Sequence, residues 1–132
     1  MSFRIIQLED LPVKIVSESD SIRMAFINAY IRKTMDDAEE KTLWKQDGEI
    51  LLKKVKKNKL EEYQDEKISE ISISYDFYTY KNMLILPFEK KGDIYITIKF
   101  NKMDYEINIE CELINILLRD KPKYVRHIKK TE

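Results

Sequence analysis

Apolar residues fall on two sides of the segment Asp20–Met35 when it is drawn as a helix. One stripe holds Ile22, Phe26 and Ala29, and the other holds Met24, Ile27 and Ile31. Ser19 or Asp20 can cap the first turn through a side-chain oxygen, and the acidic residues at 36–40 disfavour continuation beyond Met35. A surface helix of a small domain usually has one apolar stripe. We therefore expect a principal helix that is covered by the chain's own strands on one side and by a partner subunit on the other.

Runs rich in β-forming residues surround this segment. Phe3–Gln7 and Val13–Ser17 are separated at Pro12, which predicts a hairpin or two neighbouring strands. Residues 41–67 are ambiguous. Asp47-Gly48 suits a two-residue hairpin turn, whereas the apolar residues that follow, with Glu and Lys between them, suit two helices separated at the glycine. Of these, we favour a helix from Glu49 to about Gln64.

Apolar and polar residues alternate with period two in the second half, which is typical of strands with one solvent-facing side. The alternating positions are Ile71, Ile73, Tyr75 and Phe77, then Ile94, Ile96 and Ile98, and then Tyr105, Ile107 and Ile109. The run MLILPF at 83–88 adds a short strand. Turns are expected at 81–82, at KKGD (90–93) and at 101–104. Leu113–Leu118 is expected to begin a short helix.

Together these elements predict an α+β fold. Its antiparallel meander sheet has about four to six strands, with one principal interface helix and a shorter helical segment. We place this single domain at residues 1–119 and a basic C-terminal tail at 120–132. A chain of 132 residues is long enough to bury a core without metals or disulfides.

Composition narrows the class of protein. Charged residues make up 36% of the chain, yet 24 Lys and Arg balance 24 Asp and Glu, which argues against a nucleic-acid grip by the whole molecule. The single cysteine, Cys111, excludes an internal disulfide and suits a reducing compartment. The N-terminus does not resemble a signal peptide, and no apolar run approaches the ~18 residues of a membrane span. We therefore expect a cytoplasmic protein without a membrane partner.

The sequence shows no recognisable catalytic or cofactor motif. His127 is the only histidine, so one chain cannot build a metal site of the usual His/Cys type. Cys111 and His127 could in principle act as nucleophile and base, but a small packed side chain explains Cys111 better. The acidic residues at 36–40 lack the spacing of a calcium loop. We expect no catalytic residue, no metal and no cofactor.

Basic and aromatic residues offer a possible nucleic-acid surface. The lysines at 53–59 are diluted by glutamates, so a solvated face explains them better. The tail is less diluted, and its candidate phosphate-binding residues are Lys121, Lys123, Arg126, Lys129 and Lys130. The aromatic residues Tyr75, Phe77, Tyr78, Tyr80 and Tyr95 would either stack on bases or, as is more usual, pack across strands.

Residues 4–33, RIIQLEDLPVKIVSESDSIRMAFINAYIRK, resemble the start of the small α-like subunits of archaeal and eukaryotic RNA polymerases. Asp20 precedes the expected helix, and Arg32-Lys33 follow at the matching distance, although Arg23 stands where that family has Leu. Size and composition are similar to those of the small subunit of the RNA polymerase encoded by yeast cytoplasmic linear killer plasmids. The resemblance implies that the helix packs against a counterpart, forming a platform on which the catalytic subunits assemble.

The resemblance thus implies a non-catalytic assembly subunit of a multisubunit DNA-directed RNA polymerase. Its partner would be a large polymerase subunit or an α-like subunit, with nucleic acid as a further contact in the assembled complex. The expected partner-binding residues are Ile22, Phe26, Ile27, Ala29, Tyr30, Ile31, Arg32 and Lys33. Two alternatives are a virus- or phage-encoded inhibitor that binds a host protein and a single-stranded nucleic-acid-binding protein.

Overall fold

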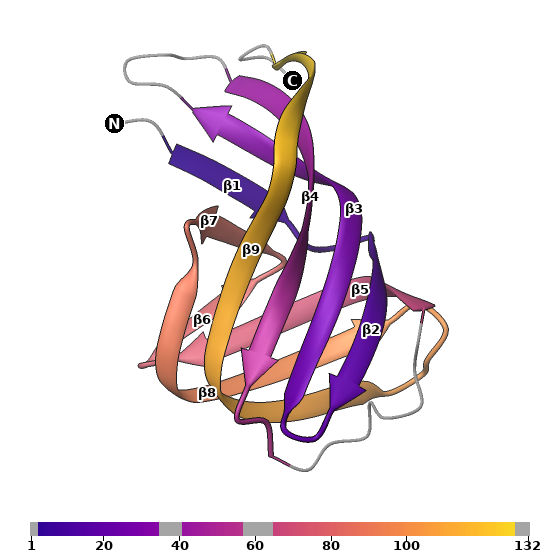
Figure 1. Cartoon of the computed structure of the whole chain (residues 1–132), viewed down its shortest axis with the longest axis vertical. Coiled ribbons are helices and arrows are strands. Elements are labelled where there is room, and N and C mark those ends of the chain that lie inside the picture. The colour runs from indigo at the N-terminus through magenta and orange to yellow at the C-terminus, as the bar shows by residue number, and fades with distance from the viewer. Residues whose placement is uncertain (1–2, 35–40, 57–64, 129–132) are drawn as a thin grey trace.

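The computed structural model describes residues 3–34, 41–56 and 65–128, and this part of the chain contains strands but no helix (Figure 1). Strands make up 84% of it. They are β1 (Phe3–Gln7), β2 (Leu11–Glu18), β3 (Ser21–Thr34), β4 (Lys41–Lys53), β5 (Asp65–Tyr75), β6 (Tyr78–Lys81), β7 (Met83–Leu86), β8 (Glu89–Phe100) and β9 (Glu106–Ile128). The predicted α+β class is therefore wrong, because the described residues form an all-β fold.

Six of the strands close into one antiparallel ring, which we call the closed sheet. The hydrogen-bonded order is β2–β5–β8–β9–β4–β3, and β3 pairs back onto β2. Every second residue points into the ring, so β8 buries Ile94, Ile96 and Ile98 while Tyr95 and Lys99 face solvent. Closure brings these inward side chains into one apolar core.

Beyond the closed sheet, β3, β4 and β9 continue as a further layer (Figure 1). β3 pairs with β2 through its first half and with β1 through its end, while β7 pairs with the other side of β1. Phe3–Gln7 and Val13–Ser17 are thus strands, as predicted, but they pair with β3 rather than with each other. We call this layer the extension; it comprises residues 3–7, 29–34, 41–47, 83–86 and 119–128.

Two strands on either side of β4 are irregular at the level where the closed sheet gives way to the extension. β3 carries an extra residue near Asn28, whose φ is 57°. β9 is irregular opposite residues 45–47 of β4, and Asp120 there has a φ of 60°. Between them, the Asp47 carboxylate accepts a hydrogen bond from the Asn28 amide at 2.8 Å. Bulges bend a strand and increase its twist, so this pair allows the strands to leave the ring.

The predicted helix from Asp20 to Met35 is wrong, because the described part of this segment is β3. Ile22, Met24 and Phe26 alternate into the core, and the extra residue then shifts the alternation so that Ala29 and Ile31 also point inward. This one-residue shift within a period-two pattern reproduces helical spacing at positions 22, 26 and 29. Five of the six residues in the two apolar stripes therefore line one core from a bulged strand, and Ile27 alone of the six is exposed.

The predictions for residues 41–67 are wrong wherever the structure describes them. Residues 41–53 form one strand, β4, which runs through Asp47-Gly48 without a turn. Gly48 is needed there for close packing, because a Cβ atom would collide with the carbonyl oxygen of Leu117 and lie 2.8 Å from Cζ of Phe26. Residues 57–64, the second half of the predicted helix, lie outside the described residues.

Alternation in the second half is confirmed as β5, β8 and β9, but these strands do not form a simple meander. β5 neighbours β8, although β6 and β7 intervene in the chain. The predicted KKGD turn is an irregularity inside β8, where Gly92 has a φ of 134°. The predicted helix at Leu113–Leu118 is wrong, since these residues lie in β9 and pair with β4. The tail continues the same strand as far as Ile128.

Candidate nucleic-acid interface

Cationic and aromatic side chains from three strands meet on the outward face of the extension. Strand register aligns Arg32, Leu43 and Arg126 in one row and Tyr30, Lys45 and Lys123 in the next. Directly opposed residues of antiparallel strands share a face, so these six form one surface, which we call the platform. Lys45 Nζ lies 5.2 Å from the centroid of the Tyr30 ring, a cation–π contact that keeps the ring beside a charge.

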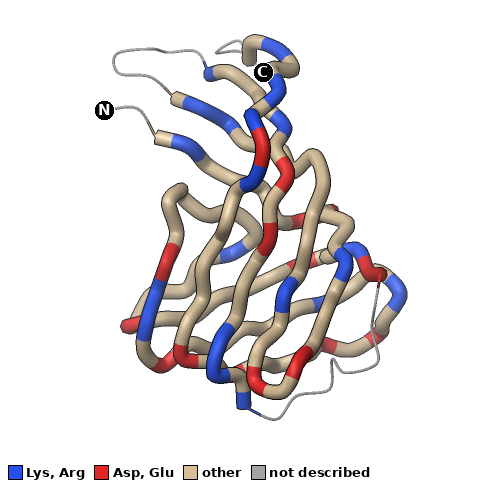
Figure 2. The backbone as a smooth tube through the Cα atoms, in the orientation of Figure 1, with Lys and Arg blue, Asp and Glu red and all other residues tan. Residues whose placement is uncertain are grey.

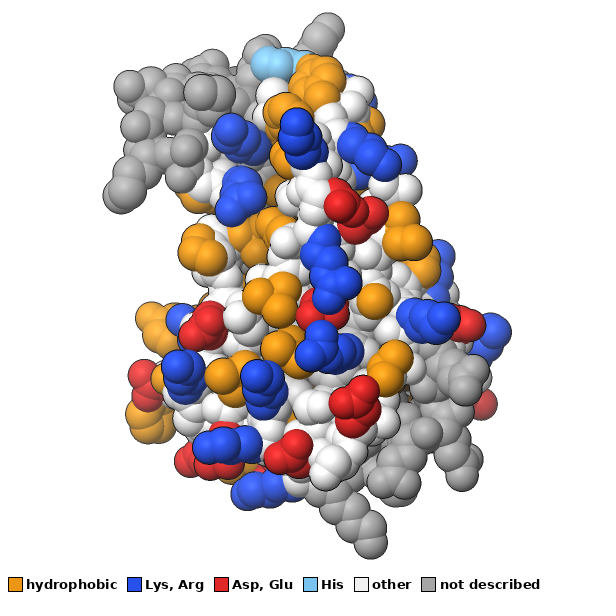
Figure 3. Space-filling model, viewed as in Figure 1, with side chains coloured by type: hydrophobic (Ala, Val, Ile, Leu, Met, Phe, Trp, Pro, Cys, Tyr) orange, Lys and Arg blue, Asp and Glu red, His pale blue; other side chains and the backbone are white. Residues whose placement is uncertain are grey.

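Basic residues greatly outnumber acidic residues in the described part of the extension. Its described residues include nine Lys and Arg but two Asp. The basic residues are Arg4, Arg32, Lys33, Lys41, Lys45, Arg119, Lys121, Lys123 and Arg126, and the acidic ones are Asp47 and Asp120. Figure 2 shows these basic positions along the upper backbone, and Figure 3 shows Lys and Arg side chains running down the viewed face. Among the described residues, the fold therefore gathers basic side chains in the extension.

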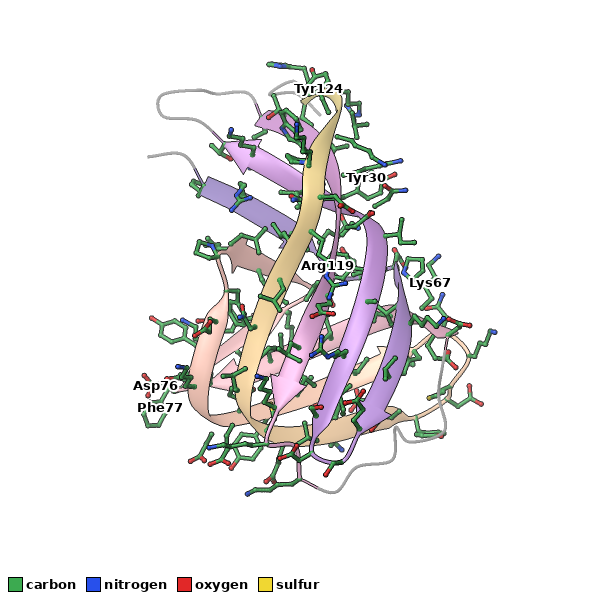
Figure 4. The ribbon with its side chains drawn as sticks, in the orientation of Figure 1. Tyr30, Lys67, Asp76, Phe77, Arg119 and Tyr124 are labelled. Carbon is green, nitrogen blue, oxygen red and sulfur yellow. The ribbon has the colours of Figure 1, made fainter. Side chains whose placement is uncertain are left out.

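Two arginines hold a buried carboxylate at the base of the platform. Glu49 of β4 is 4% exposed. Arg23 Nη1 lies 3.1 Å from Glu49 Oε1, and Arg119 Nη2 lies 2.8 Å from Glu49 Oε2. Figure 4 shows Arg119 in front of the sheet. Because two cations share one carboxylate, the cluster retains a positive charge while it ties β3, β4 and β9 together.

The predicted partner-binding residues do not share one surface. Four of them are at most 2% exposed and lie in the chain's own core: Ile22, Phe26, Ala29 and Ile31. Ile27 is 71% exposed, Tyr30 and Arg32 face outward, and Lys33 is half-buried on the inner face. The outward-facing three are therefore the ones that a partner could touch in this fold.

The described part of the basic tail belongs to the sheet and does not form a separate arm. Lys121, Lys123 and Arg126 are exposed on β9, beside the first residues of β4. Lys129 and Lys130 lie outside the described residues, as do the four acidic residues at 36–40. Pairing with β4 thus places the tail's cations next to Lys45.

Sequence interpretation missed Leu43 and Lys45 as members of this surface. A period-two signal was present, because Thr42, Trp44 and Gln46 point inward while Leu43 and Lys45 point outward. The dipeptide Asp47-Gly48 concealed it by suggesting a turn.

No catalytic constellation forms among the residues that the structure describes. Cys111 is 3% exposed, and burial raises the pKa of its thiol to about 11, so the nucleophilic thiolate is scarce at neutral pH. His127 lies sixteen residues further along the same strand. Within the described ranges, no group of three or more His, Cys, Asp and Glu side chains could hold a metal ion.

The aromatic residues of the second half lie far from the platform. Tyr80 packs edge-on against Phe88 with 5.1 Å between ring centroids, as cross-strand packing predicts. Phe77 is fully exposed at the β5–β6 turn, at the opposite end of the molecule from Tyr124 (Figure 4). Asp76 and Asp93 line the hollow beside Phe77, and their charge disfavours a phosphate backbone there.

The described residues of the lysine run at 53–59 lie at a solvent-exposed edge of the molecule. Lys53 and Lys54 are exposed, and Lys56 Nζ pairs with Glu110 Oε2 at 3.1 Å. Lys57 and Lys59 lie outside the described residues. An acidic partner on Lys56 weakens this edge as a phosphate-binding surface.

Comparisons with known protein families, with curated proteins and with solved structures found no match. The helix that the resemblance to α-like subunits implies is strand β3. Across residues 3–34, 41–56 and 65–128, no helix is long and apolar enough to cross a membrane.

Proposed function

We propose that this protein is a non-catalytic accessory protein that binds single-stranded nucleic acid across the platform. The observation that carries the proposal is the separation of charge, with nine basic and two acidic residues in the described extension of a chain whose net charge is zero. Lys and Arg side chains neutralise backbone phosphates and release the counterions condensed on them. A surface of this kind attracts nucleic acid even though the whole molecule is neutral.

The chemistry of the platform favours a single strand over a duplex. Tyr30 is 42% exposed beside Lys45, and an exposed ring on a sheet can stack on an unpaired base, worth about 1–3 kcal/mol per base. The two platform rows are two residues apart along β3 and β4, or about 7 Å, and three residues apart along β9, where the register shifts. Cations at this spacing can meet successive points of an extended backbone.

The test is fluorescence anisotropy with a labelled oligothymidine of about 20 nucleotides. Three platform cations, Arg32, Lys45 and Lys123, predict that log affinity falls with log salt with a slope of about −2. Lys45→Glu/Lys123→Glu should weaken binding at least about tenfold. The matched control is Lys14→Glu/Lys99→Glu, which reverses two exposed lysines of the closed sheet.

The proposal fails if binding shows no salt dependence, or if the platform variant and the control bind equally well. The control should retain wild-type affinity within about twofold, because its lysines lie outside the basic extension.

A second function, an assembly subunit of a multisubunit DNA-directed RNA polymerase, is favoured by Ile27. This large apolar side chain is 71% exposed and lines an outward hollow with Pro12 and Ala25. Isolated exposed apolar residues are common, but one set in a hollow suits a protein partner. In this function the outward side of β3 would contact a large polymerase subunit or an α-like subunit, with nucleic acid on the adjoining platform.

Affinity purification from the native source separates this second function from the first. Ile27→Asp should lose a co-purifying polymerase subunit, whereas Ile85→Asp, at another exposed isoleucine, should retain it. Recovery of no polymerase subunit with the wild-type protein would contradict the assembly function. It would not affect nucleic-acid binding by the platform, which the anisotropy experiment tests.

A further inference from the structure

A pocket of about 410 Å³ opens on the inner face of the extension, opposite the platform. Residues of β1, β3, β4 and β7 line it, together with Pro87 and Pro122. Because side chains alternate along β4, Trp44 and Gln46 lie on this side and Lys45 lies on the platform. We call it the Trp44 pocket, and its volume is typical of sites for small molecules.

One wall of the pocket is aromatic and apolar. Ile31 lies opposite Trp44 in the strand register, and Leu86 lines the pocket from β7. The Trp44 ring is held by two contacts. Tyr124 packs edge-on against it with 5.3 Å between centroids, and Trp44 Nε1 donates a hydrogen bond to Thr42 Oγ1 at 2.9 Å. A fixed indole beside aliphatic side chains suits a flat, apolar ring.

Two cations stand side by side on another wall. Arg4 of β1 is directly opposite Lys33 of β3, and both line the pocket. Neither has an ion-pair partner within the described part of the chain. Like charges directly opposite each other destabilise a pair of strands. An anion bound between Arg4 and Lys33 would remove that repulsion.

Gln46, which lines the pocket, has a buried hydrogen-bond acceptor that no other described residue satisfies. Gln46 is 7% exposed, and its Nε2 donates to the carbonyl oxygens of Asp120 at 2.9 Å and Arg119 at 3.4 Å. Carbonyl oxygens accept and cannot donate, so these contacts fix which way the amide group is turned. Gln46 Oε1 is left buried without a hydrogen-bond partner. Such an atom is costly to bury alone and calls for a donor.

We infer that the Trp44 pocket binds a nucleotide: a planar ring with an N–H donor, joined to a phosphate. The ring packs beside Trp44 and the aliphatic wall, its N–H group donates to Gln46 Oε1, and the phosphate lies between Arg4 and Lys33. This inference stands apart from the proposed function, because it uses the opposite face of the sheet and different side chains.

Trp44 is the only tryptophan of the chain, so its fluorescence reports on the pocket directly. Adenosine 5′-monophosphate (AMP) should quench it saturably, with isothermal titration calorimetry giving the same affinity. Adenosine, which lacks the phosphate, should bind at least about tenfold more weakly. The N6,N6-dimethyl form of AMP, which lacks the amino N–H donors, should also bind more weakly, because it leaves Gln46 Oε1 unpartnered.

Variants assign the binding to these residues. Arg4→Ala should weaken AMP binding about tenfold, whereas the control Arg32→Ala, on the platform, should leave it unchanged. Gln46→Met removes the acceptor but also the hydrogen bonds to β9, so its circular dichroism and unfolding must match the wild type before its affinity is compared.

Absence of quenching at millimolar AMP, or equal affinity of Arg4→Ala and the wild type, would overturn the inference. Lys45→Glu/Lys123→Glu should still bind AMP while it loses the oligonucleotide. The site in the pocket and the platform therefore succeed or fail separately.

Discussion

The closed sheet and the extension share three long strands but bury them differently. In the closed sheet, the inner face of β3, β4 and β9 meets the opposite wall of the ring, and apolar residues such as Met24, Ile50 and Ile116 fill it. In the extension, the inner face also carries Lys33, Trp44 and Gln46, which line a pocket. A sheet face that is released from the core can carry charge and hydrogen-bonding groups. Both candidate binding surfaces therefore lie in the extension.

The largest expected effect is on the free energy of unfolding. It compares an inward-facing and an outward-facing side chain of β3 at the boundary between the closed sheet and the extension. Phe26→Ala should lower the free energy of unfolding by about 3–5 kcal/mol, because it leaves a cavity in the core. Ile27→Ala, one residue later, should change it by less than about 0.5 kcal/mol, because that side chain is 71% exposed. Urea denaturation measures both. Similar losses for the two variants would contradict the outward position of Ile27 on a bulged strand.

A smaller effect is expected at Gly48, where β3, β4 and β9 pack closely. Gly48→Ala should cost about 1–3 kcal/mol, because the new methyl group collides with the Leu117 carbonyl and the Phe26 ring. Lys45→Ala, on the outward face of the same strand, serves as the control and should stay within about 0.5 kcal/mol of the wild type. Thermal unfolding followed by circular dichroism compares them. A neutral Gly48→Ala would show that the strands are further apart here than the structure places them.

The smallest effect concerns pH and the closed sheet alone. Burial raises the pKa of the Cys111 thiol from 9.0 to about 11. The thiol exposed by unfolding ionises at the lower pKa, so this group leaves stability unchanged below pH 9 and reduces it as pH rises from 9 to 11. The melting temperature of Cys111→Ala should therefore fall less steeply between pH 9 and pH 11 than that of the wild type. Equal slopes would contradict burial of the thiol in the core.

Local patterns predicted several strands correctly and failed where an irregularity changed the phase of the pattern. The alternation of Ile94, Ile96 and Ile98 survives in β8 because each residue keeps its period-two position. In β3, the extra residue near Asn28 gave helical spacing to residues that all face one core. A bulge depends on the neighbouring strands, so its effect on spacing cannot be separated from a helical period in one segment alone.

The sequence by itself determined the alternation of most strands, the absence of a recognisable catalytic motif and the presence of a basic C-terminal segment. Tertiary structure decided which strands meet, because hydrogen bonding between strands joins residues far apart in the chain. It closed the ring between β2 and β3, and it brought Tyr30, Lys45 and Lys123 into one row from three distant segments. It also turned Trp44 and Gln46 to the opposite face, towards Arg4 and Lys33. Net charge is additive along a sequence, whereas charge separation and pockets depend on pairing between distant strands.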